Sequence, residues 1–435
     1  FWLKFLRAVL PCDRTIHAAG RRENLRERII SIYTKALEKG MAYSVRLTMF
    51  LAATVAAIPT FNINLDLPPE VRFANVTQRF RQENLAVLAH MMDALKRDFS
   101  EDEVREWVER LKVHVPEEEE FKKELQGIAK DLDGQKWEEL YHQILLFNAA
   151  YELQFTYGCS GILAADVNGT VIHGRNLDFR FVYKMPDGAE HDWPDLAFNA
   201  VFYQNGQQLI VAPMFALYNG LHTGMRLGAW SFEQNTRHSN DHKLNLEELK
   251  RGGHLYHWWI RRYMQDTSDF EEAIEKIRHT HWAAPQYFIM AGAGRFQGIV
   301  ITQDRGTGKS LADTPELQRL GPEAGVWNIL QTNDDANKMP DDPRRPIAKM
   351  VLSREHQQDV NTTFMWKNIL QPALDAPGRV FTWVGVPRTN YWFTVLRNET
   401  VPSDALVPPA PALHQGGRKV VGATKWARKA LLQNS

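Results

Sequence analysis

The sequence predicts a mixed α+β protein in which a helical N-terminal segment precedes sheets covered by helices. Three observations favour this class. Apolar residues recur at helical spacing within residues 77–157, alternating strand-like runs begin abruptly at Cys159, and strand-like and helical segments then follow each other to residue 400. We expect the strands to assemble into sheets with helices packed outside them.

Composition and charge exclude several classes of protein. The chain has 435 residues and is 44% hydrophobic, which is enough for one large domain or two smaller ones. Lysine plus arginine equals aspartate plus glutamate at 52 each, so no global charge attracts nucleic acid. The two cysteines, Cys12 and Cys159, cannot build a disulfide framework within residues 60–435, and zinc-ligand spacings are absent. We therefore predict no metal and no cofactor.

The N-terminal region has the layout of a targeting signal. Residues 41–57 contain Met41, one arginine and a short apolar run with small residues near its end, which predicts a cleaved secretory signal peptide. We expect residues 1–40 to be an extension that precedes a true start at Met41; the alternative is a signal anchor with residues 1–40 in the cytosol. A lysosomal or secreted protein follows from the first alternative. Four glycosylation sequons fit this route, at Asn75, Asn168, Asn361 and Asn398.

Local signals define the expected elements. Ser100 and Glu103 form a capping-box pattern for one helix, and Asn168-Gly169 is a hairpin signal between the first two strands after Cys159. The proline-rich and then basic tail, residues 401–435, is expected to be solvated, with contact to anionic membrane as the alternative. Further helices are expected at 136–153, 245–264, 268–279 and 362–371. Strands are expected at 160–166, 170–174, 196–204, 208–215, 228–232, 286–291, 297–303, 327–332, 379–385 and 391–397.

Cys159 is the candidate nucleophile. A lone cysteine is more often a small buried apolar residue. Three neighbours favour catalysis here: Gly158 relaxes the backbone before the thiol, and Arg175 and Asp178 lie on the returning strand. An arginine can hold a carboxylate or carbonyl groups near a thiol, and a buried aspartate can accept a hydrogen bond from an amine.

The motif that starts at Cys159 resembles one protein family. Cys-Ser-Gly-Ile at 159–162 followed by His-Gly-Arg-Asn-Leu-Asp-Phe at 173–179 is similar to the start of the β-subunit of acid ceramidases and N-acylethanolamine-hydrolysing acid amidases. These are N-terminal-nucleophile hydrolases, related more distantly to bile-salt hydrolases and penicillin V acylases. The resemblance implies a four-layer αββα sandwich with a helical N-terminal α-subunit. It extends to residues 63–69, 127–129, 147–148, 151–153, 221–224, 287–289, 300–305, 331–333 and 341–345.

The resemblance also implies a zymogen. The chain would cut itself between Gly158 and Cys159, and the resulting α-subunit (58–158) and β-subunit (159–400) would remain together as a heterodimer. The thiol would attack the preceding carbonyl, and water would resolve the thioester. The freed α-amine has a reference pKa of about 7.7–8.0 and can serve as the general base for its own thiol.

Further roles are carried over by position. The resemblance implies that Arg175 orients the site, that Asp178 binds the freed amine, and that Asn333 donates an N–H to the oxyanion. Arg344 would support the site through ion pairs. Because Pro343 makes the register of the motif ambiguous, Arg345 is the alternative to Arg344. If neither arginine has a functional role, both are expected to lie in a surface loop of ion pairs.

One position departs from the family pattern. This chain has Asn235-Thr236-Arg237 where the family has a glutamate in the middle position. In the family that acid belongs to the hydrogen-bond network of the site and to activation, so Thr236 could weaken or retune self-cleavage. A non-catalytic lipid-binding relative is therefore one alternative function.

Two other groups of residues are weaker candidates. His238, Asp241 and His242 have a metal-like spacing, but Ser239 and Asn240 favour an exposed loop instead of a metal site. His173 lies within the motif, and its strand position favours packing over catalysis.

The expected substrate is a fatty-acid amide, reached through peripheral contact with a membrane. N-acylethanolamines are favoured over ceramide because the paired C-terminal cysteines of acid ceramidases are absent near Leu396. An apolar helix bearing Leu88, Met91, Met92 and Leu95 could supply the membrane contact, although a core face is the alternative for that stripe.

Overall fold

The computed structural model describes residues 58–153, 158–237, 241–306, 317–339, 341–397 and 399. The predicted N-terminal extension, signal peptide and basic tail lie outside these residues, as do His238 and Asn398. Residues 182–191 belong to one compact unit, in which β4 (Tyr183–Lys184) and β5 (Glu190–His191) form a short hairpin. The other described residues form a second unit, which contains Cys159.

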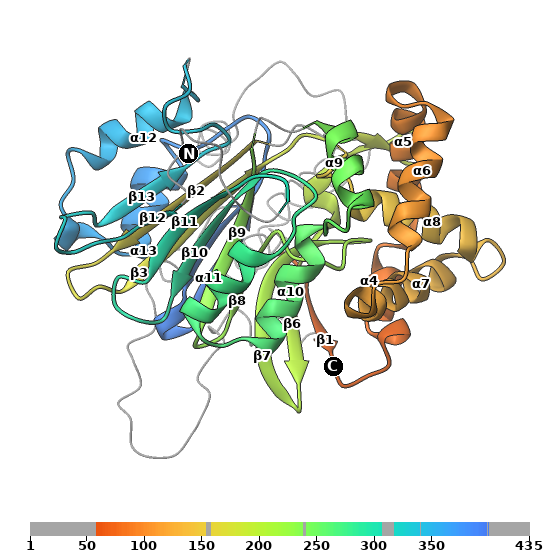
Figure 1. Ribbon diagram of the computed structural model, residues 1–435, viewed down its shortest axis with the longest axis horizontal. Coiled ribbons are helices and arrows are strands. Elements are labelled where there is room, and N and C mark those ends of the chain that lie inside the picture. The colour runs from red at the N-terminus through yellow and green to blue at the C-terminus, as the bar shows by residue number, and fades with distance from the viewer. Residues whose placement is uncertain are drawn as a thin grey trace, which may run out of the picture. The chain divides into compact units, whose positions relative to one another are not determined.

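A helical segment opens the second unit (Figure 1). The predicted capping box is confirmed: the Ser100 hydroxyl accepts from the Glu103 N–H, and the Glu103 carboxylate accepts from the Ser100 N–H. The helices are η1 (Pro69–Val71), α4 (Ala74–Arg79), α5 (Arg81–Asp98), α6 (Glu101–Lys112), η2 (Pro116–Glu118), α7 (Glu119–Leu132) and α8 (Trp137–Asn148). Leu88, Met91 and Leu95 of α5 are buried, so this apolar stripe is a core face and does not contact a membrane. Within the described residues, no helix is both long and apolar enough to cross a membrane.

An eight-stranded sheet follows, in the order β1-β6-β7-β8-β9-β10-β11-β12. Its first strand, β1, precedes the helical segment in sequence and pairs in parallel with β6, whereas the other pairs are antiparallel. The strands are β1 (Thr60–Asn64), β6 (Ala197–Gln204), β7 (Gln207–Phe215), β8 (Thr223–Arg226), β9 (Trp230–Thr236), β10 (Gln286–Gly292), β11 (Gly298–Gln303) and β12 (Leu317–Arg319).

A five-stranded antiparallel sheet carries Cys159, in the order β13-β2-β3-β14-β15. Its strands are β2 (Gly158–Ala165), β3 (Val171–Asp178), β13 (Asn328–Gln331), β14 (Arg379–Val386) and β15 (Tyr391–Leu396). The predicted hairpin between β2 and β3 is present, and Gly169 adopts a φ of +79° in its turn. Asn168, which lies beside Gly169, is exposed, as are the sequon residues Asn75 and Asn361.

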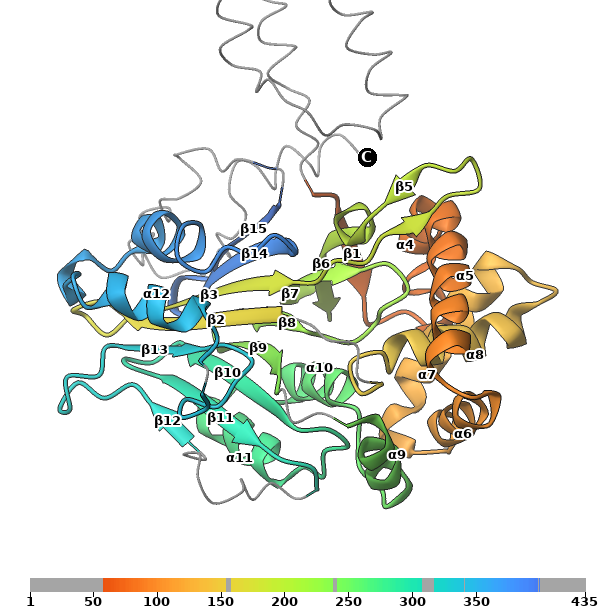
Figure 2. The same cartoon turned by 90° about the horizontal axis from the view of Figure 1, so that it is seen from above.

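The two sheets pack face to face, with helices on their outer faces (Figure 2). Leu163 of β2 packs against Tyr287 and Val300 of the eight-stranded sheet, whereas Ile162 faces the other way, against the segment around Phe364. The outer helices are η3 (Trp193–Leu196), α9 (His242–Lys250), α10 (Tyr256–Asp266), α11 (Phe270–His279), α12 (Arg344–Leu352), η4 (Gln357–Asp359), α13 (Thr362–Phe364), η5 (Met365–Leu370) and η6 (Pro387–Thr389). The predicted α+β class with a helical N-terminal segment is confirmed.

Several predicted elements differ in their boundaries. The single helix expected over 245–264 is two helices, α9 and α10, because Gly252 has a φ of +95° and Gly253 lies against the Glu248 carbonyl. The helix expected over 362–371 is a short α-helical turn that continues as a π-helix, η5. Arg344 and Arg345, for which a surface ion-pair loop was the structural alternative, are the first two residues of α12 instead.

A buried ion pair joins the helical segment to the helices of the sheet layer. The Glu124 carboxylate of α7 accepts from both terminal nitrogens of Arg261 on α10, at 2.5 and 2.7 Å, and from Asn219 and Arg72. Glu124 and Arg261 are both fully buried. Because an unpaired charge is costly to bury, removing one partner destabilises the fold strongly.

We expect Glu124→Gln to lower the free energy of unfolding by about 3 kcal/mol, because Arg261 keeps its charge and loses its counter-ion. Chemical denaturation measures the change in a Cys159→Ala background, which is expected not to cut itself. The matched control is Glu120→Gln: Glu120 also binds Arg72 but has a side chain that is 33% exposed, so we expect a loss of about 1 kcal/mol or less. Equal losses in the two variants would contradict the assignment of Glu124 as the buried counter-ion.

Candidate functional site

Cys159 is the second residue of β2 and is fully buried. In the ladder with β3, Cys159 pairs with Leu177, Gly161 pairs with Arg175, and Gly158 pairs with Asp178. Directly opposed residues share a face of an antiparallel sheet, so Cys159 and Arg175 point into the space between the two sheets. Asp178 points to the opposite face, on the side of Gly158.

The Arg175 guanidinium lies against the thiol. Its Nη2 is 3.3 Å from Cys159 Sγ and 2.7 Å from the Gln234 carbonyl oxygen. Its Nη1 donates to the His222 carbonyl and the Thr223 hydroxyl. Arg175 is fully buried, and these contacts fix the direction in which it presents its charge. The arrangement can stabilise a thiolate at Cys159.

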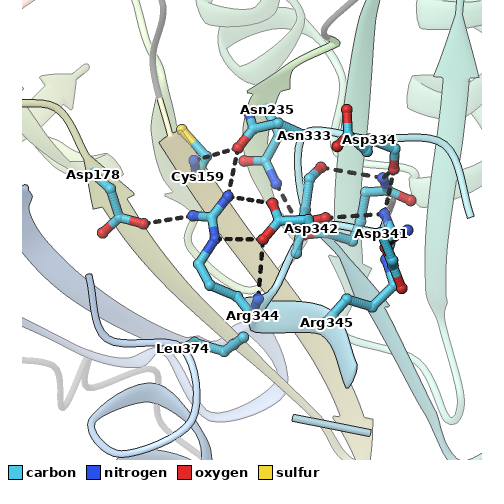
Figure 3. A network of polar contacts seen from close by, with 12 residues as sticks. Cys159, Asp178, Asn235, Asn333, Asp334, Asp341, Asp342, Arg344, Arg345 and Leu374 are labelled. Atoms are coloured by element: carbon cyan, nitrogen blue, oxygen red, sulfur yellow. Dashed lines mark hydrogen bonds and ion pairs between the residues drawn. The ribbon is translucent and has the colours of Figure 1, made fainter. Parts of the chain in front are cut away.

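Asp178 and Arg344 form an ion pair on the other face of β2 and β3 (Figure 3). The Arg344 Nη1 donates to Asp178 Oδ2 at 2.7 Å, and its Nη2 donates to Asn333 Oδ1 at 2.9 Å and to Asp342 Oδ2 at 2.6 Å. A methyl carbon added at Gly158 would lie 3.6 Å from Arg344 Nη1. Arg344 therefore lies beside the peptide that joins Gly158 to Cys159.

Asn333 binds the backbone of Cys159. Its Oδ1 accepts from the Cys159 N–H at 2.7 Å, and its Nδ2 donates to the Thr236 carbonyl oxygen at 2.8 Å. In the uncut chain the amide N–H that was predicted to bind an oxyanion is thus already bonded. The Thr236 backbone belongs to the site although its side chain supplies no acid, and the oxyanion role of Asn333 stays a prediction.

Arg345 occupies a different environment from its neighbour. It is fully buried and donates to the Thr332 hydroxyl, the Asp334 and Asp335 carbonyls and the Asp341 carboxylate. These contacts hold the loop that carries Asn333. The structure therefore brings Arg344 to the predicted site residues and leaves Arg345 in a supporting position, which favours the first of the two registers.

Burial controls the protonation of the site. It raises the pKa of the Cys159 thiol, against the opposing effect of Arg175. It also raises the pKa of Asp178 to about 7, against the opposing effect of Arg344. A thiol in these surroundings is mostly protonated, so its activation requires a proton acceptor.

An aromatic pocket adjoins the thiol and had no counterpart among the predicted site residues. Leu177, the ladder partner of Cys159, belongs to its lining. The cavity itself is small, with a volume of about 20 Å³. The lining residues come from α8, β3, η3, β7 and the loops beside them: Phe147, Ala150, Tyr151, Leu177, Phe179, Trp193, Phe215, Tyr218 and His222. The motifs at 147–153 and 221–224 were the signals in the sequence that could have located it.

His222 is held at the edge of this pocket by aromatic residues. Its ring stacks on Tyr218 with centroids 4.1 Å apart, and its Nδ1 bonds the Tyr256 hydroxyl. Burial and the charge of Arg175 hold the pKa of His222 well below its usual value. The neutral imidazole of His222 is therefore a polar group in the lining of the pocket. The sequence motif at 221–224 did not identify this role.

Glu152 titrates in an unusual range. It is fully buried, and burial raises its pKa to about 8, against the effect of the backbone N–H groups of Glu152 and Tyr256. A carboxyl group with a higher pKa in the folded chain than in the unfolded chain stabilises the fold below its unfolded pKa. That contribution is lost as the pH rises through the folded value.

We therefore expect the free energy of unfolding to fall by about 3 kcal/mol between pH 5 and pH 8 from this group. In a Cys159→Ala background, Glu152→Gln should remove that part of the pH dependence, as measured by denaturation at each pH. The control is Glu101→Gln on the exposed surface of α6, which should leave the dependence as it is. An unchanged slope in Glu152→Gln would show that Glu152 does not titrate in this range.

Residues outside the site include the metal-like histidine pair. His242 begins α9 and lies 3.7 Å from a Glu103 oxygen, and His238 lies outside the described residues. Among the described residues no group of three or more histidine, cysteine, aspartate or glutamate side chains is arranged to hold a metal ion.

Comparison with known proteins gives a consistent set of relatives. The family model described as the beta subunit of N-acylethanolamine-hydrolyzing acid amidase matches residues 56–115. Human acid ceramidase is 32% identical over 330 residues, covering 71% of this chain and 78% of its own. The N-acylethanolamine-hydrolyzing acid amidase of Caenorhabditis elegans is 27% identical over 336 residues, covering 75% of this chain and 88% of its own.

A solved structure belongs to the same group. The Caenorhabditis elegans N-acylethanolamine-hydrolyzing acid amidase ortholog matches with a TM-score of 0.45 at 27% identity, over 53% of this chain and 93% of its own. The identity to human acid ceramidase extends over most of both chains. This chain belongs to the acid ceramidase and N-acylethanolamine-hydrolysing acid amidase family.

Proposed function

We propose that this protein is a cysteine amidase that cuts its own chain between Gly158 and Cys159 and then hydrolyses fatty-acid amides, with N-acylethanolamines as the favoured substrates. One observation carries the proposal. The Cys159 thiol lies one residue after Gly158 and 3.3 Å from Arg175, while Asn333 and Arg344 bind or adjoin the peptide between them. The fold proposed for this chemistry is the αββα N-terminal-nucleophile sandwich.

Self-cleavage forms one bond and breaks one bond in each of two steps. Cys159 Sγ attacks the Gly158 carbonyl carbon, and the C–N bond breaks to give a thioester and a free α-amine on Cys159. Water then hydrolyses the thioester, which leaves a Gly158 carboxylate and restores the thiol. The ladder position of Asp178 opposite Gly158 supports its proposed role as the partner of the new amine.

Amide hydrolysis repeats the same chemistry on a substrate. The freed amine takes the thiol proton, the thiolate attacks the amide carbonyl, and the proton passes to the leaving amine. Water then releases the fatty acid from the acyl-enzyme. Arg175 holds the thiolate, and donors beside the thiol stabilise the tetrahedral intermediate.

The lining of the aromatic pocket supports an apolar group as the part of the substrate to be bound. Because the cavity volume is about 20 Å³, a fatty acyl chain enters only when the lining side chains move apart. The lining is almost entirely aromatic and aliphatic, and Leu177 places it beside the thiol. Burial of apolar surface is the main source of affinity for such a chain.

Ceramide is the second candidate substrate. The 32% identity to human acid ceramidase favours it, whereas the absence of a cysteine pair near Leu396 favours N-acylethanolamines. Hydrolysis of ceramide and of N-palmitoylethanolamine by the same cut enzyme decides between them. We expect the ethanolamide to have the higher kcat/KM, and a higher value for ceramide would assign the protein as a ceramidase.

The proposal extends to assembly and location. The two chains produced by the cut remain a heterodimer, because β1 and Glu124 belong to the first chain and their partners β6 and Arg261 belong to the second. The signal-peptide layout and the sequons support passage through the secretory pathway to the lysosome or the exterior. Peripheral membrane contact would deliver the lipid substrate.

A denaturing gel tests the first step of the proposal. The purified chain, kept at acidic pH with a reducing agent, should give two bands. N-terminal sequencing of the larger fragment should show that it begins at Cys159. A single uncut band that hydrolyses no amide would instead assign the chain as a non-catalytic lipid-binding relative.

A further inference from the structure

A buried acid and histidine pair lies beside the site and has no role in the chemistry proposed above. Glu233 of β9 and His173 of β3 are both fully buried, with Glu233 Oε2 3.1 Å from His173 Nε2. His173 Nδ1 lies 2.9 Å from the Ser231 hydroxyl, which fixes the ring. Packing alone would not require a carboxyl group here, because an apolar residue of similar size costs less to bury.

The second carboxylate oxygen of Glu233, Oε1, faces the strand that carries Cys159. Oε1 makes no well-formed hydrogen bond within the described residues, and a methyl carbon added at Gly161 would lie 2.0 Å from it. Gly161 and Cys159 are two residues apart on β2 and therefore point to the same face. The absence of a side chain at Gly161 is what allows the carboxyl group to approach this part of the strand.

Arg175 lies against the thiol and is the ladder partner of Gly161, which Glu233 faces, and among the described residues it forms no ion pair with a carboxylate. Its four hydrogen-bond acceptors are two carbonyls, a hydroxyl and the thiol. A fully buried guanidinium requires a counter-charge. The acidic groups that act on the charge of Arg175 are Cys159, Glu233 and the phenol of Tyr151. Asp178 points to the other face, where Arg344 offsets its charge.

In the uncut chain, the amine that would take the thiol proton in the cut enzyme does not yet exist. Before cleavage the nitrogen of Cys159 is an amide, whose N–H is donated to Asn333. It cannot take the thiol proton. We propose that Glu233, supported by His173, is a positioning residue that shares one proton with Cys159 across Arg175, so that the thiolate forms as Glu233 becomes protonated.

This inference rests on the proposed function of Cys159. It assigns a carboxyl group to the site of a chain in which Thr236 stands where the family has a glutamate. The balance of charge is constant: Arg175 is neutralised either by the Glu233 carboxylate with a neutral thiol, or by the thiolate with a neutral Glu233. The two states hold the same number of protons and differ in whether that proton lies on Sγ or on Glu233, so ionisation of Glu233 opposes ionisation of the thiol. Glu233 touches neither the thiol nor the scissile peptide in any recorded contact, and it acts through Arg175.

The electrostatic surroundings agree with this geometry. Burial raises the pKa of Glu233, with His173 and Arg175 opposing it, and Glu233 in turn raises the pKa of the Cys159 thiol. The titratable and charged groups that face Glu233 are His173 and Arg175 from β3 and Cys159 from β2. Its ladder neighbours on β8 and β10, Thr223 and Ile289, do not titrate.

The rate of self-cleavage as a function of pH tests the shared proton. Freshly translated, labelled chain is moved into buffers from about pH 4 to pH 9, and cutting is followed on a denaturing gel. For the wild-type chain, the logarithm of the rate should rise with pH and then flatten where Glu233 loses its proton. In Glu233→Gln the rise should continue, so that one pH unit above the flattening this variant cuts about tenfold faster.

Matched variants separate charge from structure. Glu152→Gln, which also exchanges a buried carboxyl group for an amide, should keep the wild-type profile. Glu233→Asp retains a carboxyl group and should keep the flattening; if Glu233→Gln does not fold, loss of the flattening in Glu233→Asp overturns the proposal. Coincident profiles for wild type and Glu233→Gln overturn it as well.

The test also separates this inference from the proposed function. If Cys159→Ala still cuts, or the wild-type chain does not cut after Gly158, the proposed function fails and the shared proton fails with it. If cutting requires Cys159 and the profiles of wild type and Glu233→Gln coincide, the inference fails alone.

Discussion

Cys159→Ala is expected to leave the chain uncut and to lower amide hydrolysis by at least about 10⁴-fold, the order of loss seen when a nucleophile is removed. Both effects have one physical cause, because the same sulfur forms the thioester in self-cleavage and in substrate turnover. No other cysteine lies in the described part of the chain. The measurements are a denaturing gel and the release of fatty acid from N-palmitoylethanolamine.

The control is the adjacent Ser160, a fully buried residue whose hydroxyl is the nearest alternative nucleophile along β2. Successive residues of a strand point to opposite faces, so Ser160 points away from Arg175. We expect Ser160→Ala to cut and to hydrolyse amides. If the Cys159→Ala chain were cut, or the Ser160→Ala chain were not, Cys159 would not be the nucleophile.

Arg344→Leu is expected to slow self-cleavage by at least about 100-fold, a loss typical of removing groups that orient a reacting bond. This change removes the donors to Asp178, Asn333 and Asp342 together. Asn333 then loses one of the contacts that hold its oxygen at the Cys159 N–H. The rate of appearance of the two fragments measures the effect.

Arg345→Leu should act on stability instead. Arg345 has no contact with Asp178 or Asn333, and it binds the Asp334 and Asp335 carbonyls and the Asp341 carboxylate. We expect it to lower the free energy of unfolding by about 3 kcal/mol, whereas the fraction that folds should still cut. Lys349→Ala on the exposed side of α12 should change neither property. If Arg345→Leu slowed self-cleavage and Arg344→Leu only lowered the free energy of unfolding, Arg345 would be the site residue.

The sequence carried enough information for the class of fold and for the choice of Cys159 as the candidate nucleophile. Alternation from Cys159 onward reports strands because a half-buried strand must alternate, and the capping box at Ser100 reports a helix start because it satisfies the free N–H groups there. The sequence did not show that helix 245–264 is divided at Gly252, since a glycine is also tolerated inside a helix.

Contacts between distant segments were beyond reach of the sequence. Nothing local indicates that Asn333 binds the nitrogen of Cys159, or that Glu233 lies against Gly161. Such contacts arise from the packing of one sheet on the other and from α12, an element that the sequence analysis did not predict. The family resemblance supplied Asn333 and Arg344 by position, whereas Glu233 could be recognised only from the structure.

The parallel pairing of β1 with β6 has a consequence for how the enzyme can be produced. A recombinant β-subunit that began at Cys159 would lack Thr60–Asn64 and would expose the backbone of Ala197–Gln204 as an open sheet edge, which invites aggregation. Supplying residues 58–158 as a separate chain would have to rebuild a strand and a buried ion pair in one docking event. Synthesis as a single polypeptide would avoid this problem, because β1 would cover the edge before the proposed cut at Gly158.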